Sequence, residues 1–372
     1  MNRRPQTPSF WSKKFRIAKR YWPIFLLVNI IAFNEYFIYY STLIAQCSWP
    51  CDPDKGCSED ALKSFMIADT HLLGKERGHW FDKMRREWQM FMSYRAATAI
   101  FDPDVVFFLG DLLDEGQWAD EKTFAEYADR FHSLFPSKNK RPERIACAGN
   151  HDLGFHYAMN QYRNLWFLKH FNNSAIEMIT VKGNRFVLMN SMAFEGDNCR
   201  FCASVEQRVF QYGKILESEG KRPIVIQHFP LFRTSDDECE PDEEERRRFD
   251  EEKYRERWEV VSREATKTII QQLRPRAVFD GHSHKNCRKI WRHPEEFTEY
   301  TVNSFSWRNN NRPALLLTVI ENDQAYRRMD ISKTFGGRAL DRKWATDGPG
   351  DRWTVDGRHM DRWRGECTAC QI

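Results

Sequence analysis

The stretch FFLGDLLDEG, residues 107–116, passes from an apolar run to acidic side chains. The apolar part predicts a buried β-strand, and it stops at Gly110, directly before Asp111 and Asp114. In an open α/β sheet, ligands bind at the edge where the carboxyl ends of the strands converge. The stretch therefore predicts a layered α/β or α+β fold with a polar site at the carboxyl edge of a sheet.

Other apolar runs recur along the chain with helical stretches between them, and four of these runs also end in side chains that bind metals. They end in ADTH, GNHD, IQHF and GHSH. A single His or Asp after a strand is more often a cap or a turn former than a ligand. The combination favours a metal site. Its candidate residues are Asp69, His71, Asp111, Asp114, Asn150, His151, Asp152, His228, His282 and His284.

The types of these side chains restrict the metal. Carboxylate and amide oxygens mixed with imidazole suit manganese, iron or zinc, whereas the lack of thiolate ligands argues against a structural zinc site. Two ions about 3.5–4 Å apart that share one carboxylate would clamp a phosphoryl group during in-line displacement. Asp111 is the predicted shared carboxylate.

The ordered motifs DxH, GDxxD, GNHD, H and GHxH resemble those of the calcineurin-like metallophosphoesterases. The resemblance implies two mixed β-sheets in a sandwich flanked by helices, and a metal-dependent hydrolase of phosphoric esters. It implies one divalent metal on Asp69, His71 and His284, another on Asn150, His228 and His282, and Asp111 between them.

The resemblance also implies that His151 stabilises the transition state and protonates the leaving alkoxide. Asp114 and Asp152 are interpreted as groups that orient a ligand His or cap a helix. The weaker candidates are His79, His156 and Arg308.

Finer features, such as ADTHLLG, RREWQM, AGNHDLGFHY and SFSWRN, narrow the resemblance to members that remodel glycosylphosphatidylinositol (GPI) anchors. It implies a manganese-dependent phosphodiesterase that removes ethanolamine-phosphate from the second mannose of GPI anchors, with iron or zinc as alternative metals. GPI-anchored proteins would be its partners, in the endoplasmic reticulum, its exit sites and the early Golgi. Another phosphoester substrate, or a non-catalytic trafficking scaffold with the same fold, are the alternatives.

A membrane anchor is predicted near the N-terminus. Residues 1–23 carry basic side chains and no acidic one, and the apolar stretch 24–45 would form a helix about 33 Å long. Glu35 near its middle costs about 2.5–3.5 kcal/mol, and a partner for its charge would reduce that cost. A cleaved signal peptide and a core helix are the alternatives. The positive-inside rule puts residues 1–23 in the cytosol and the catalytic domain in the lumen.

The rest of the chain divides by composition. We expect a linker at 46–60, a catalytic domain at 61–332 with a charged insertion at 236–259, and a polar tail at 333–372. Members of the GPI-remodelling group carry a second transmembrane helix, which this tail does not provide. Outside the N-terminus the charges nearly balance, which argues against a nucleic-acid partner.

Ten cysteines favour an oxidising compartment. Cys47, Cys51 and Cys57, and the CxxC pair Cys199 and Cys202, are predicted to form disulfides whose pairing stays open. Asn172 begins the sequon NNS, which would carry a glycan in the lumen.

Overall fold

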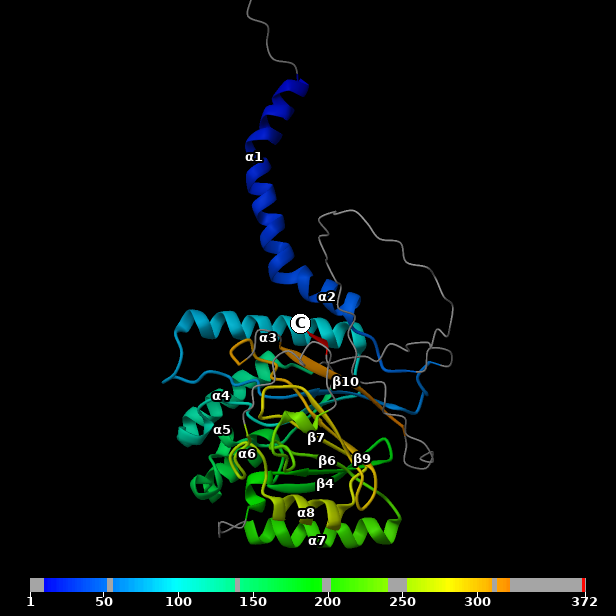
Figure 1. Ribbon diagram of the computed structural model, residues 1–372. Coiled ribbons are helices and arrows are strands. Elements are labelled where there is room, and N and C mark those ends of the chain that lie inside the picture. The colour runs from blue at the N-terminus through cyan, green and yellow to red at the C-terminus, as the bar shows by residue number, and fades with distance from the viewer. Residues whose placement is uncertain are drawn as a thin grey trace, which may run out of the picture.

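The computed structural model describes residues 10–51, 56–137, 141–195, 202–239, 253–309, 313–321 and 370–371. Two β-sheets form its central layers, with helices on their outer faces (Figure 1). The first sheet has the order β11 (Cys370–Gln371), β10 (Ala314–Ile320), β1 (Leu62–Ile67), β2 (Val105–Phe108) and β3 (Glu143–Ala146). The second has the order β4 (Ile176–Val181), β5 (Asn184–Met189), β6 (Ile224–Ile226), β7 (Ala277–Asp280), β9 (Phe297–Thr301) and β8 (Cys287–Trp291).

Both sheets are mixed, as predicted. In the first, β1, β2 and β3 are parallel, and β10 runs antiparallel to β1. In the second, β5, β6, β7 and β9 are parallel, while β4 and β8 are antiparallel edge strands. The parallel strands of both sheets end at the edge that carries the candidate ligands.

Strand β2 explains why its sequence is apolar without alternation. Val105 and Phe107 face the core between the sheets, where the Phe107 ring lies 4.9 Å from that of Phe186. Val106 and Phe108 face the outer layer of helices. A strand covered on both faces is apolar at every position, as strands in parallel sheets commonly are.

The helices form two outer layers. Helix α4 (Glu121–Leu134) covers the first sheet, since Phe131 packs on Phe108, and α3 (Trp80–Phe101) lies across the same side of the domain (Figure 1). Helix α6 (Gln161–Phe171) packs beside α4. Helices α7 (Cys202–Glu219) and α8 (Arg263–Leu273) pack together below the second sheet.

The predicted N-terminal helix is present. It runs through α1 (Phe10–Ala32), a π-helical turn η1 (Phe33–Phe37) and α2 (Ile38–Gln46). Its part Lys19–Gln46 is long and apolar enough to cross a membrane, which makes it a candidate membrane span. Glu35 has the partner that its charge requires, because Arg85 on α3 lies 2.5 Å from its carboxylate.

Disulfides form at most of the predicted cysteines. Cys51 pairs with Cys57, and Cys239 at the start of the charged insertion pairs with Cys287 on β8. Cys47 and Cys202 are also disulfide-bonded, which confirms the prediction for both. Cys199 lies outside the described residues, as do residues 240–252 of the insertion and all of the tail except the two residues of β11.

Candidate metal centre

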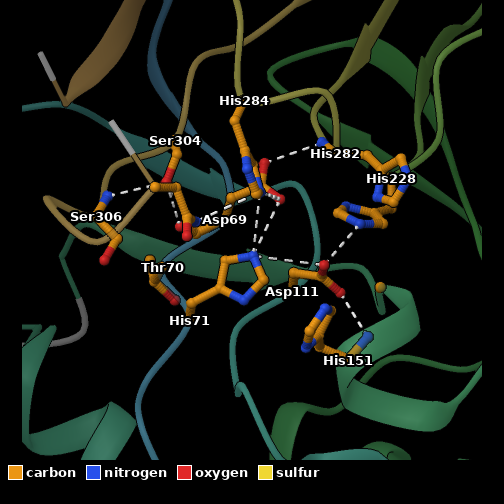
Figure 2. Close-up of polar contacts among 12 residues, drawn as sticks. Asp69, Thr70, His71, Asp111, His151, His228, His282, His284, Ser304 and Ser306 are labelled. Atoms are coloured by element: carbon orange, nitrogen blue, oxygen red, sulfur yellow. Dashed lines mark hydrogen bonds and ion pairs between the residues drawn. The ribbon is translucent and has the colours of Figure 1, made fainter. Parts of the chain in front are cut away.

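The candidate ligands come from five strand ends that meet at one edge of the sandwich. Asp69 and His71 follow β1, and Asp111 follows β2. Asn150 begins α5 (Asn150–Leu153), the short helix after β3. The remaining ligands follow β6 and β7 of the second sheet, and they are His228, His282 and His284. The two sheets therefore contribute to one site (Figure 2).

Most of these residues adopt a backbone conformation that is rare outside glycine. Their φ angles are 55° at Asp69, 44° at His71, 49° at Asp111, 67° at His282 and 56° at His284. A left-handed conformation costs a non-glycine residue roughly 1–3 kcal/mol, and such residues concentrate at functional sites. The turns at the strand ends are thus shaped for the direction of the side chains rather than for backbone stability.

The first cluster consists of Asp69, His71 and His284. The Asp69 Oδ1 atom lies 3.3 Å from His284 Nε2 and 3.6 Å from His71 Nε2, and the two imidazole nitrogens are 3.2 Å apart. The other carboxylate oxygen, Oδ2, accepts a hydrogen bond from the His282 N–H at 2.9 Å. One oxygen is therefore held by the backbone, and the other faces both histidines.

The second cluster consists of Asp111, His228 and His282. Asp111 Oδ2 lies 3.2 Å from His228 Nε2, and the imidazole centroids of His228 and His282 are 5.0 Å apart. Asn150 is buried and its Oδ1 atom forms no hydrogen bond with the described residues.

Asp111 lies between the two clusters. Its Oδ2 atom is 3.6 Å from His71 Nε2 in addition to its contact with His228, and its Oδ1 atom accepts a hydrogen bond from the His151 N–H at 2.7 Å (Figure 2). Burial acts to raise the pKa of this carboxyl, but His228, His151 and His71 together hold it well below its usual range. The group is an ionised carboxylate placed to serve both clusters.

Buried atoms without hydrogen bonds test whether metals fit here. Asp69 Oδ1, Asn150 Oδ1 and His228 Nε2 are such atoms among the described residues. Leaving a buried polar atom unsatisfied costs about 1–3 kcal/mol, so a cluster of them calls for another partner. Their chemistry of carboxylate, amide oxygen and imidazole nitrogen fits two divalent cations.

Hydrogen bonds on the far side of the rings fix which nitrogen faces the clusters. His71 Nδ1 donates to Asp114 at 3.2 Å, and His228 Nδ1 donates to the Leu109 carbonyl at 2.8 Å, which leaves Nε2 as the candidate ligand atom in both. His282 donates from Nε2 to the Trp258 carbonyl at 2.8 Å, so its Nδ1 atom is the candidate ligand atom.

Asp114 contacts a candidate ligand His and Asp152 caps α5, which are the two roles that the sequence predicted for this pair. Asp114 holds His71 and also contacts Arg308 Nη1 at 2.5 Å. Burial acts to raise the pKa of Asp114, but His71 and Arg308 together lower it to about 2. Asp152 accepts hydrogen bonds from three backbone N–H groups and so joins the loops after β2 and β3. The donors are Gly149, Leu112 and Leu113.

Two glycines explain the spacing of the motifs. A Cβ atom at Gly149 would lie 2.1 Å from Asp111 Oδ1, and one at Gly110 would lie 2.6 Å from His228 Nδ1. Gly110 also has a φ of 93°, which favours glycine. Each glycine lets one backbone pass directly beside a ligand.

His151 stands beside the clusters at a partly exposed position. Its ring lies 4.6 Å from the ring of His71, and its Nδ1 atom donates to the Asp114 carbonyl at 2.9 Å. The side chain is 26% exposed, whereas that of His71 is 4% exposed. Its Nε2 atom is the one left for a substrate.

Of the three weaker candidates, two have structural roles and one contacts the site. His79 is the N-cap of α3, where its side chain accepts a hydrogen bond from the Phe81 N–H, and His156 contacts the carbonyls of Met192 and Arg257. Only Arg308 reaches the site, through Asp114.

Two contributing residues were not predicted individually. Ser304 donates to the Asp69 carbonyl at 2.8 Å, and Asn309 Nδ2 lies 3.4 Å from His284 Nε2. Both belong to the stretch SFSWRN, which the sequence singled out only as a finer feature of the resemblance.

Comparisons with known proteins identify the family of this chain. Residues 62–286 match the family model described as calcineurin-like phosphoesterase. A "Metallophosphoesterase 1 homolog" of Caenorhabditis elegans is 49% identical over 84% of this chain and 83% of the relative. One of Drosophila melanogaster is 41% identical over 76% of this chain and 78% of the relative. A solved dimetal phosphatase from Danio rerio is 12% identical with a TM-score of 0.46, and the match covers 70% of this chain and 92% of that one. The family model and the relatives match most of the catalytic domain, so the chain belongs to the calcineurin-like phosphoesterases and is a metal-dependent phosphoesterase.

Proposed function

We propose that this protein is a membrane-anchored phosphodiesterase with two metal ions that removes the ethanolamine-phosphate branch from the second mannose of GPI anchors. This reaction would aid transport of GPI-anchored proteins from the endoplasmic reticulum to the Golgi. The observation that carries the catalytic part is the Asp111 carboxylate between two ligand clusters, with His151 beside it. The choice of substrate rests on the finer motifs that resemble the GPI-remodelling members.

We assign the first metal to Asp69, His71 and His284, the second to Asn150, His228 and His282, and the bridging position to Asp111. Manganese is our proposal for the native ion, with iron and zinc as alternatives of similar ligand preference. When bound, the ions would supply positive charge for the phosphoryl group and lower the pKa of water toward neutrality.

The chain itself would position the proton donor. Hydrolysis breaks the P–O bond to the mannose, joins an oxygen from water to phosphorus and leaves an alkoxide that needs a proton. His151 Nε2 would give that proton, because Nδ1 is held by the Asp114 carbonyl. The Asp114 carboxylate, 3.5 Å from Nδ1, would stabilise the charged ring before transfer.

The proposed lumenal placement has two supports. Six described cysteines are disulfide-bonded, which is typical of an oxidising compartment (Cys47, Cys51, Cys57, Cys202, Cys239 and Cys287). Asn172, the acceptor of the sequon, is exposed at the end of α6. Glycosidase-sensitive glycosylation of the wild type, absent from Asn172→Gln, is expected if this domain faces the lumen.

Mass analysis of GPI anchors tests the substrate. Cells that lack this protein should keep the extra ethanolamine-phosphate, and wild-type protein should remove it while His151→Ala should not. Unchanged anchors would reject the GPI substrate and leave the metal-dependent phosphoesterase in place. Purified protein that binds no metal would instead favour the scaffold, and preference for a phosphomonoester over a diester would reject the diesterase assignment.

A further inference from the structure

Helix α3 exposes an apolar surface at its N-terminal end. Trp80 is 66% exposed, and Phe81 and Met84 are each 53% exposed. Scattered apolar side chains are normal on a surface, but three within the first turns of one helix form a patch. We call these three residues the α3 patch.

The candidate membrane helix leaves the domain from this same helix. Glu35 pairs with Arg85 on α3, and Tyr36 packs edge-on against Trp88 with ring centroids 5.4 Å apart. Farther along, Leu43 is fully buried against the domain. Figure 1 shows α1 rising away from the domain beyond this contact, with α3 lying across the end from which it leaves.

The length of the free helix limits how far the domain stands from a bilayer. The largely exposed part of the helix that precedes Glu35, residues 21–34, is about 21 Å long, whereas the hydrocarbon core is about 30 Å thick. A helix fixed in this way spans the core only if its next turns also enter the membrane or its headgroup layer. Those turns are the ones that contact α3, so spanning brings α3 to the membrane surface.

From these observations we infer that the α3 patch docks into the headgroup layer of the membrane that the N-terminal helix crosses. The inference rests on the proposed membrane anchoring of this chain. The helix that contacts α3 also exposes apolar side chains, since Phe37 is 62% and Ile44 is 68% exposed. Tryptophan and other amphipathic aromatic residues favour this layer.

Part of the charge near the patch is balanced within the protein. Arg86 pairs with Asp82 at 2.8 Å, and Arg85 pairs with Glu35. Lys83 stands between Phe81 and Met84 in the sequence, so the patch would contact a lipid surface through apolar burial together with a basic side chain at headgroup level.

Docking would bring the metal centre close to the membrane. The loop from His71 to Trp80 joins the ligands to the α3 patch, and its Arg77 N–H donates to Glu115, the residue after Asp114. A phosphodiester attached to a membrane lipid would therefore be presented to the site by the docked orientation, while a soluble diester would gain nothing from it.

Photocrosslinking of the full chain in phosphatidylcholine vesicles tests the contact. A photoreactive phenylalanine analogue would replace Phe81, with Leu27 as the position for the span and Phe210 on α7, 39% exposed, as the matched control. We expect lipid adducts at positions 27 and 81 and none at 210. Adducts at 27 alone would overturn docking and keep the anchor. Adducts at neither would reject the anchor, and adducts at all three would show unspecific contact and overturn the inference.

Turnover gives a second test. The double variant Trp80→Ser/Phe81→Ser should lower hydrolysis of a lipid-tethered aryl phosphodiester in vesicles by about tenfold, since the lost apolar contact weakens docking. Its hydrolysis of soluble bis(p-nitrophenyl) phosphate should stay at the wild-type rate, as should both activities of Phe210→Ser. Equal loss on both substrates would overturn docking, whereas a wild type inactive on both diesters would reject the proposed phosphodiesterase instead.

Discussion

The two ligand clusters differ in what holds their histidines. In the first cluster, His71 donates to a side chain, the carboxylate of Asp114, which also contacts Arg308. In the second cluster, both rings donate to backbone carbonyls, those of Leu109 and Trp258. Exposure does not distinguish the clusters, because each has two buried side chains and one that is partly exposed, His284 in the first and His282 in the second.

The difference in hydrogen-bond partners predicts that substitution of a neighbouring side chain changes metal affinity in the first cluster but not in the second. A carboxylate that accepts the ring N–H makes the opposite nitrogen a stronger ligand, and substitution of that carboxylate changes metal affinity. A backbone carbonyl cannot be removed by changing its side chain. We therefore expect the affinity of the first metal to respond to substitutions around it, and that of the second to depend on its ligands alone.

Asp111→Asn should have the largest effect, because Asp111 is the one ligand that both clusters share. The amide keeps the shape but loses the charge that holds two cations and two histidines. We expect metal content to fall from two equivalents to below one and turnover to fall by at least about 10³-fold. Elemental analysis of purified protein and a diester assay measure both. Two retained equivalents would reject the bridging position.

His151→Ala should leave both clusters intact and still remove most activity. His151 contributes its backbone N–H to Asp111, which the substitution keeps, while the ring is lost. General acid catalysis contributes about 10²–10⁴-fold, so kcat should fall within that range at full metal content. The loss should be smaller for a diester whose leaving group is a good one, such as p-nitrophenolate, than for an alkyl diester. Equal rates to wild type on the alkyl diester would remove His151 from the mechanism.

The meeting of the candidate ligands at one sheet edge could be predicted because each follows a strand and the motifs occur in a recognisable order. The geometry of those turns could not, since five of the ligands have positive φ, a conformation that no local pattern of Asp and His foretells. The roles of Asp114 and Asp152 followed from their place in the motifs, and the structure adds only their partners.

Contacts between distant segments account for what the sequence left open. The partner of Glu35 is Arg85, fifty positions away, and Cys239 pairs with Cys287 across a separation of 48. Neither residue carries a local signal of its partner. His79 was one of the weaker site candidates, and the hydrogen bond from the Phe81 N–H identifies it as a helix cap.

Asp114→Asn should weaken the first metal selectively. The amide cannot match the charged acceptor for His71 Nδ1, and changes of this kind cost about 10–100-fold in metal affinity. The second metal should bind as in wild type. Calorimetric titration with Mn²⁺, interpreted with His284→Ala and His228→Ala as references for each cluster, separates the two affinities. Asp129→Asn, an exposed carboxylate on α4, is the control. Equal weakening of both metals would contradict the distinction between the clusters.

Arg308→Met should give the smallest effect, and it tests whether a residue that contacts Asp114 also influences the affinity of the first metal. Arg308 Nη1 contacts Asp114 Oδ1, the same oxygen that accepts from His71 Nδ1, and the Arg308 side chain is 30% exposed. Because Asp114 would still accept from His71, the affinity of the first metal should fall by about threefold, less than with Asp114→Asn. Arg95→Met, at an exposed position on α3, is the control. If metal affinity stays unchanged while KM for the diester rises, Arg308 binds the substrate phosphate directly. The influence of neighbouring side chains on the first metal would then be limited to Asp114.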